Sequence, residues 1–127
     1  MKIVSEVNLT SENPIKVGKF NVIHIIKLSV ILNAVCEVNE VAAFDVKGKR
    51  RFNELMTARR EYCYLAWKLT KLTERNPYGN SLSVIGAEIG KSHANVLHHK
   101  DKVIDWLEIQ SYGLVEKLEM IEAKLSI

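Results

Sequence analysis

Two short helical segments joined by a very tight turn constrain the fold of this chain more than any other feature of its sequence. Ser81 and Ser92 each stand just before an apolar helical pattern, where a serine side chain can cap the first turn of a helix. Gly90 lies between them, placed to end the first helix in the left-handed conformation. The apolar residues that we expect to face inward are Leu82, Ile85, Ile89, Val96, Leu97 and Val103. Two short helices so connected are typical of a helix-turn-helix, which we predict from Leu82 to Val103.

The rest of the chain is predicted to be mostly helical, which makes the fold all-α. Residues 20–39 are apolar enough and long enough for a helix, although their β-branched side chains leave a strand open for the first half. A basic loop is expected over 45–51, and a long helix over 53–74 that stops at the turn-forming residues 76–80. Residues 1–19 carry turn signals and are interpreted as an N-terminal arm.

A heptad-like apolar pattern continues beyond the helix-turn-helix. It predicts a helical extension over residues 111–127, after a helix-turn-helix domain over 20–110, although Gly113 weakens the pattern. The apolar stripe must be covered either by the N-terminal apolar run of the same chain or by a second copy. We favour a symmetric homodimer, because paired helix-turn-helix units commonly read two half-sites. The residues expected in that interface are Leu107, Leu114, Leu118, Ile121 and Leu125.

The composition fits one soluble domain, with 127 residues of which 47% are hydrophobic and 26% charged. Lys27 and Asn33 interrupt the most apolar stretch before it reaches the roughly 18 residues that cross a membrane. The first residues lack the pattern of a secretion signal, so we expect a cytoplasmic protein. Cys36 and Cys63 have no metal-ligand spacing and are expected to be buried free thiols.

Catalytic and metal-binding patterns are missing from the sequence. His93 lies five and six residues from His98 and His99, and these separations do not bring imidazoles together on a helix as four would. His98 is therefore expected to pack or hydrogen-bond within the domain. Glu88 and Asp101 form no evident catalytic pair, and no nucleophile is spaced beside a base. We expect no enzymatic activity, no cofactor and no metal.

Positive charge is gathered in one segment of the chain. Six basic residues stand against the single acid Glu54 between Lys47 and Arg60, whereas six acids outnumber three bases from Asp101 onward. A protein that concentrates its positive charge in this way can attract a polyanion without being strongly basic overall.

Three pieces of the sequence, AVCEVNEVAAFDVKGKRR, ARREYCYLAWKLT and SLSVIGAEIGKSHANVLHHKDKV, agree in order and spacing with a known family. From about Ile31 to Leu107 the chain resembles the C-terminal DNA-binding domain of DnaA, the family of bacterial replication initiators. The segment IGAEIG followed by SHANVLHH is the most specific of these pieces, because it crosses the turn into the recognition helix. The resemblance implies an all-helical domain that binds double-stranded DNA in the major groove.

The resemblance also implies roles for individual residues. It assigns base reading to Ser92, His93, Ala94 and Asn95. It assigns phosphate contact to the basic loop, at Lys49, Arg50 and Arg51, and we expect Lys91 to join them. It assigns a minor-groove contact to Arg59, at the head of the long helix. The alternatives are that Ser92 is only a cap, that Asn95 only faces water and that the basic loop is only solvated.

Two departures from the family pattern limit what can be carried over. The family's aspartate before the histidine and its two following threonines are replaced here, so its target sequence is not transferred. No GxxxxGK[ST] phosphate loop occurs anywhere in the chain, so initiator ATPase activity is not expected. We expect a sequence-specific DNA binder that acts as a regulator or a replication accessory factor. The alternatives are a protein-interaction or dimerisation module that has lost base reading, and an acidic-tailed mimic that occupies a partner's DNA-binding surface.

Overall fold

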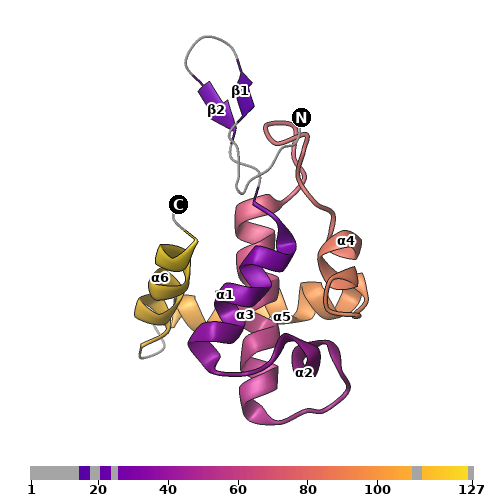
Figure 1. The fold of residues 1–127 in the computed structure, drawn as a ribbon, viewed down its shortest axis with the longest axis vertical. Coiled ribbons are helices and arrows are strands. Elements are labelled where there is room, and N and C mark those ends of the chain that lie inside the picture. Colours follow the sequence, from indigo (N-terminus) through magenta and orange to yellow (C-terminus); the bar gives the residue numbers. More distant parts are fainter. Residues whose placement is uncertain (1–14, 18–20, 24–25, 110–112, 126–127) are drawn as a thin grey trace.

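The computed structural model describes residues 15–17, 21–23, 26–109 and 113–125, and most of the expected N-terminal arm lies outside them. These residues form a small antiparallel strand pair and six helices (Figure 1). The strands are β1 (Ile15–Val17) and β2 (Asn21–Ile23), and the helices are α1 (Leu28–Asn39), α2 (Ala43–Lys47), α3 (Asn53–Thr70), α4 (Leu82–Ala87), α5 (His93–Glu108) and α6 (Leu114–Lys124). The predicted all-α fold is confirmed, and none of the described helices is long and apolar enough to cross a membrane.

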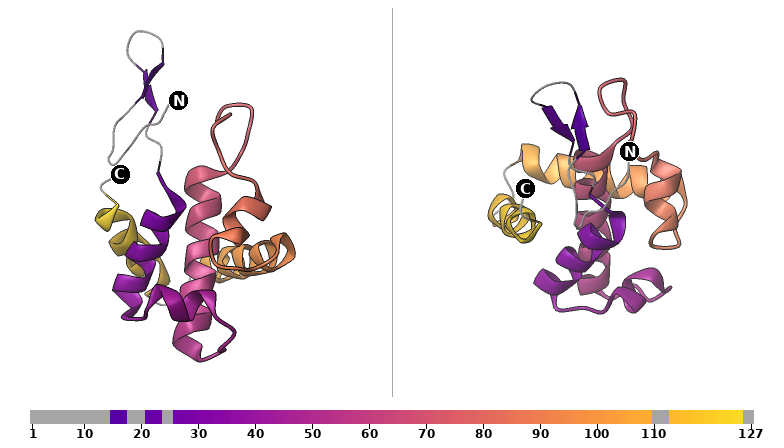
Figure 2. Two further views of the ribbon diagram at one scale, coloured as in Figure 1. Left: turned by 45° about the vertical axis from the view of Figure 1, so that its right-hand side comes forward. Right: turned by 45° about the horizontal axis from the view of Figure 1, so that its top comes forward.

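Helix α3 forms the centre of the core and packs against α1, α2, α4 and α5 (Figures 1 and 2). Its apolar residues recur at steps of three and four, so one face of the helix is continuously buried. The hydroxyl of the buried Tyr62 donates a hydrogen bond to the carbonyl oxygen of Ile85 at 2.8 Å, which fastens α3 to α4. Cys36 and Cys63 are buried free thiols, as predicted, and burial raises the pKa of Cys63 to about 12. A thiol held protonated in this way is structural rather than reactive.

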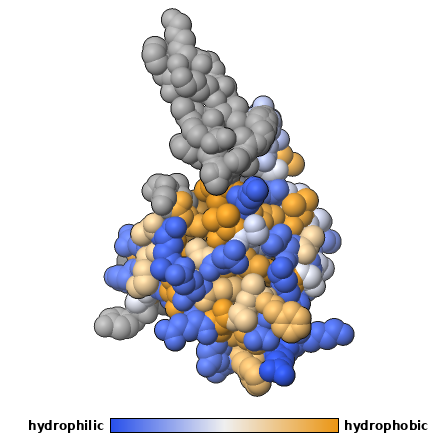
Figure 3. Space-filling model, in the orientation of Figure 1, coloured by the Kyte–Doolittle hydropathy of each residue, from blue (hydrophilic) through white to orange (hydrophobic). Residues whose placement is uncertain are grey.

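The apolar run at residues 20–39 does not form one helix. Strand β2 occupies part of its first half, in keeping with the β-branched residues there, and the helix begins only at Leu28. Helix α1 ends at Asn39, and the next residue, Glu40, caps it with a φ of 57° in the left-handed region. On the face seen in Figure 3, hydrophobic residues gather in the upper part of the coloured surface, and hydrophilic residues cover much of the remainder.

Two predicted boundaries around α3 are wrong. The expected basic loop begins too early, because Asp45–Lys47 are the last residues of α2, anchored by the fully buried Val46. Helix α3 ends at Thr70 rather than at residue 74, since Lys71 turns to an extended ψ of 143°. The amide of Leu72 donates to the carbonyl oxygen of Asn80 at 3.1 Å, so the connecting segment closes on itself instead of extending the helix.

The C-terminal heptad pattern does not form one continuous helix. Helix α5 ends at Glu108, and α6 follows Gly113, which has a φ of 78°; Ser111, one of the heptad positions, lies outside the described residues. Helix α6 lies beside α1 in both views and buries Leu118 and Ile121, which are 5% and 0% exposed (Figures 1 and 2).

An ion pair between the half-buried Lys117 and the buried Glu61 fastens α6 in this position. The Nζ of Lys117 lies 2.8 Å from Oε2 of Glu61 and donates to Oδ1 of Asn39 at 2.7 Å, which joins α6 to α3 and α1. The apolar stripe of α6 is therefore covered by the same chain, which was the alternative left open by the sequence. The homodimer predicted through this stripe is not shown. Leu107, Leu114 and Leu125 are likewise half-buried against the core.

Candidate nucleic-acid interface

The helix-turn-helix forms as the sequence predicts. The hydroxyl oxygen of Ser81 accepts a hydrogen bond from the amide of Val84, and that of Ser92 accepts one from the amide of Asn95, both at 3.3 Å. Gly90 has a φ of 69°, the left-handed value expected of it. Both predicted caps and the predicted glycine conformation are confirmed.

The two helices approach so closely that the turn tolerates no side chain at Gly86. A Cβ atom built there would lie 2.4 Å from the carbonyl oxygen of Lys91 and 3.0 Å from the side chain of Val96. The amide of Lys91 donates to the carbonyl oxygen of Gly86 at 2.9 Å, which closes the turn. This contact fixes the direction in which the first turn of α5 leaves the domain.

The first turn of α5 is open to solvent. Ser92, His93, Ala94 and Asn95 are all exposed, so the structure brings together the four residues predicted to read bases. The side-chain amide of Asn95 folds back and donates to the hydroxyl oxygen of Ser92 at 3.2 Å. Partial positive charge at the start of the 16-residue α5 also favours anions there.

Two predictions on α5 are wrong. Leu97 was expected to face the core, but it is 42% exposed on the same surface as the open first turn. His98, expected to pack or hydrogen-bond within the domain, is exposed, with its ring centroid 5.7 Å from that of His99. His99 is the histidine that packs, at 5% exposure. Val96 and Val103 are fully buried, as predicted.

A basic groove of about 310 Å³ runs beside this surface, between the basic loop, α3 and α5. Its cationic lining residues are Lys49, Arg51, Arg59, Arg60 and Lys91, and Asn95, His98 and His99 line the side formed by α5. Arg50 does not line the groove, and its guanidinium lies 6.0 Å from the ring centroid of Phe52.

The cations of this groove lack acidic partners. Within the part of the chain that the structure describes, neither the groove cations nor Lys47 and Arg50 form an ion pair. Burial, followed by repulsion from Arg59, Lys49 and Arg51, lowers the pKa of Lys91. Positive charges held together without acids make a surface that an anion stabilises.

Arg59 is buried and is hydrogen-bonded to the protein backbone. Its side chain is 2% exposed, and its Nε donates to the carbonyl oxygen of Val46 at 2.9 Å. Its Nη2 donates to the carbonyl oxygens of Asp45 and Gly48, both at 3.1 Å. The guanidinium thus binds carbonyl oxygens of α2 and of Gly48, so Arg59 holds the basic loop in place. Its minor-groove contact stays a prediction.

Arg60 is the arginine of α3 that sequence reasoning missed. It is half-buried, lines the groove, and places its guanidinium 5.3 Å from the ring centroid of Trp106. The signal was present in the sequence, because Arg59 falls on the same helical spacing as the buried Leu55 and Tyr62, whereas Arg60 is turned about 100° from that face.

His99 lies at the inner side of the same groove as an uncharged ring. Burial, followed by the nearby charges of Arg60, His98, Arg59 and Lys91, lowers the pKa of His99 to about 4. Its Nδ1 is buried and has no hydrogen-bond partner among the described residues. No group of three or more metal-ligating side chains occurs within the described ranges.

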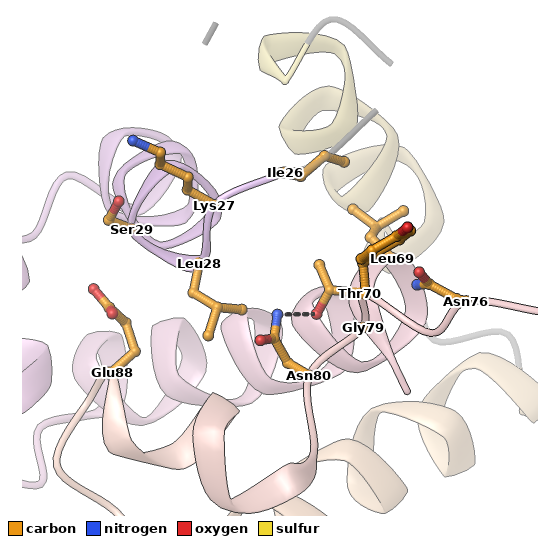
Figure 4. A pocket seen from close by; sticks show the side chains of 11 residues that line it. Ile26, Lys27, Leu28, Ser29, Leu69, Thr70, Asn76, Gly79, Asn80 and Glu88 are labelled. Carbon is orange, nitrogen blue, oxygen red and sulfur yellow. Dashed lines mark hydrogen bonds between the residues drawn. The ribbon is translucent and has the colours of Figure 1, made fainter. Parts of the chain in front are cut away.

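A second hollow, of about 330 Å³, lies at the start of α1 and differs in charge (Figure 4). Its lining includes one cation, Lys27, and one acid, Glu88, and the amide of Asn80 donates to the hydroxyl of Thr70 at 3.2 Å. The charges balance, so this hollow has no excess positive charge to attract a polyanion.

Comparison with known sequences identifies the same region. The family described as bacterial DnaA protein helix-turn-helix matches residues 28–103, from the start of α1 into α5. The chromosomal replication initiator protein DnaA of Lacticaseibacillus casei strain BL23 is 37% identical over 75 residues, which cover 58% of this chain and 15% of that protein. The protein of the same name from Caldanaerobacter subterraneus subsp. tengcongensis is 27% identical over 100 residues, which cover 79% of this chain and 20% of that protein. The chain thus matches a fifth or less of the length of these relatives.

Proposed function

Because this chain belongs to the bacterial DnaA helix-turn-helix family, we propose that it binds double-stranded DNA with sequence preference, with the first turn of α5 in the major groove. The observation that carries this proposal is the position of the open first turn of α5 directly beside a groove of unpaired cations. Base reading and phosphate contact need these two surfaces side by side.

The exposed side chains supply the chemistry for base reading. Asn95 can leave Ser92 and bind adenine through N6 and N7, and His93 can donate to guanine. The methyl group of Ala94 can contact the methyl group of thymine, and the hydroxyl of Ser92 can reach a base or a phosphate. Lys49, Arg50, Arg51 and Lys91 contact backbone phosphates, which gives affinity that depends on salt but not on sequence.

The protein acts by contact, without catalysis, as a regulator of transcription or as an accessory factor in replication. It acts in the cytoplasm, where the chromosome of a bacterial cell lies. The match to the initiators covers only a fifth or less of their length, so their initiation activity is not part of this proposal. A homodimer through α6 is not part of this proposal either, since Leu118 and Ile121 of α6 are buried in the single chain.

A protein-interaction module that has lost base reading is the second candidate. It is favoured by two aromatic side chains that flank the basic loop, Phe44 and Phe52, which are 84% and 61% exposed. Aromatic residues exposed to this degree are enriched in protein interfaces. The unpaired cations between them favour DNA instead.

Selection from a pool of random duplexes separates these candidates. The wild-type chain should enrich a short motif, and the variant His93→Ala with Asn95→Ala should bind DNA but enrich none. Recovery of no motif by the wild type, with weak and uniform binding, would reject base reading. A chain that retains no duplex at 50 mM salt would reject DNA binding altogether and favour the interaction module.

A further inference from the structure

The groove between α3 and α5 contains a guanidinium that the family resemblance did not assign. We propose that this groove seats one phosphate of the DNA backbone and that Arg60, held against Trp106, is its main ligand. This proposal rests on the proposed DNA-binding function and names a residue that the function does not itself require.

Two of the four other cations of the groove, Arg59 and Lys91, are partly committed to the protein backbone. Arg59 donates to three carbonyl oxygens, as described above, and the Nζ of Lys91 donates to the carbonyl oxygen of Gly48 at 2.7 Å. Arg60 makes no hydrogen bond to the protein within the described ranges, and its buried Nε has no partner. An arginine with unused donors in a positively charged groove lacks an acceptor, and a phosphate supplies several.

Trp106 fixes where the guanidinium of Arg60 can be. The separation of 5.3 Å between the guanidinium carbon and the ring centroid is a cation–π contact, and the ring lies on the last turn of α5. A planar guanidinium held in this way presents paired donors to a phosphate with little loss of side-chain freedom. A lysine at this position would keep the charge but lose the paired geometry.

The neighbours of Arg60 exclude a carboxylate as the resident partner. No Asp or Glu lines the groove, and Lys49, Arg51 and Lys91 line it together with Arg60. His99, 5% exposed, packs at the inner side with its Nδ1 unpartnered. The groove therefore combines excess positive charge with unsatisfied polar atoms. Asn95 also lines the groove, so a phosphate seated there lies next to the first turn of α5, which is proposed to read bases.

The test compares two arginines of equal charge. Arg60→Ala is measured against Arg75→Ala, which removes a charge from the exposed segment between α3 and α4. Duplex affinity is measured by fluorescence anisotropy from 50 to 200 mM salt, with urea unfolding as the control for folding. Arg60→Ala should bind about tenfold more weakly and should lower the salt slope, which is the slope of the logarithm of the binding constant against the logarithm of the salt concentration, by about 0.9. Arg75→Ala should change the affinity and the salt slope less. Arg60→Lys should keep the slope but bind more weakly than wild type.

A second experiment, without DNA, separates this proposal from the proposed function. Inorganic phosphate is titrated while the fluorescence of Trp106 is followed in a Trp67→Phe background. If the chain binds no duplex, the proposed function fails, and the phosphate titration decides the seat by itself. A saturable change in Trp106 fluorescence that Arg60→Ala abolishes would support the phosphate seat. The absence of any fluorescence change would overturn the seat. If duplexes are bound, equal affinity and equal salt slope for wild type and Arg60→Ala overturn the seat and leave the function standing.

Discussion

The buried ring of His99 makes folding stability depend on pH in a defined direction. Its pKa falls from the ordinary value of 6.5 to about 4 in the folded chain, first because it is buried and then because Arg60, His98, Arg59 and Lys91 face it. The unfolded chain therefore binds the proton more readily, so stability is full above pH 6.5 and is lost as the pH falls toward 4. These two pKa values predict a loss of about 2 kcal/mol between pH 7 and pH 5.

The replacement His99→Gln isolates this contribution, because glutamine is polar, of similar size and does not titrate. The free energy of unfolding is measured with urea at pH 7 and pH 5 for both proteins, following the helical signal in circular dichroism. Titrating carboxylates are common to both, so the difference between the proteins reports His99 alone. The wild type should lose about 2 kcal/mol more than the variant over this interval. An equal loss in both proteins would show that His99 is not held uncharged, and the reasoning from its burial would be refuted.

Four further substitutions test separate parts of the structure. Asn95→Ala should cost about 1–3 kcal/mol on the selected DNA site and much less on random duplexes, and equal losses on both would make the residue structural. Arg51→Ala should lower the salt slope by about 0.9 for all duplexes, and an unchanged slope would remove it from the interface. Leu118→Glu should unfold the chain rather than split a dimer, and sedimentation equilibrium should find the wild type monomeric; a wild-type dimer that this substitution separates would restore the interface. Gly86→Ala should lower the urea midpoint markedly because of the 2.4 Å approach to the carbonyl oxygen of Lys91, and an unchanged midpoint would contradict that packing.

The parts of the fold that were predictable depend on local chemistry. The caps at Ser81 and Ser92 and the left-handed Gly90 follow from backbone donors and steric rules that act within a few residues. The exposed first turn of α5 follows from the same signals, since an N-cap fixes where a helix begins.

The parts that were not predictable depend on contacts between distant segments. The burial of Leu118 is decided by α1, more than 70 residues earlier, and a heptad pattern alone cannot distinguish that cover from a second chain. The end of α3 at Thr70 depends on pairing with the segment near Asn80. Arg59 was assigned by resemblance, although its own spacing placed it on the buried face of α3.

The carbonyl oxygen of Gly48 joins the two surfaces that DNA is proposed to contact. It accepts hydrogen bonds from Arg59 at 3.1 Å and from Lys91 at 2.7 Å, so the basic loop is tied both to α3 and to the turn before α5. The distance between the loop and the base-reading turn is thereby set before any DNA arrives. In the proposed complex we therefore expect a duplex to fit only when its phosphates and base edges have the matching separation, so that the shape of the DNA is selected together with its sequence.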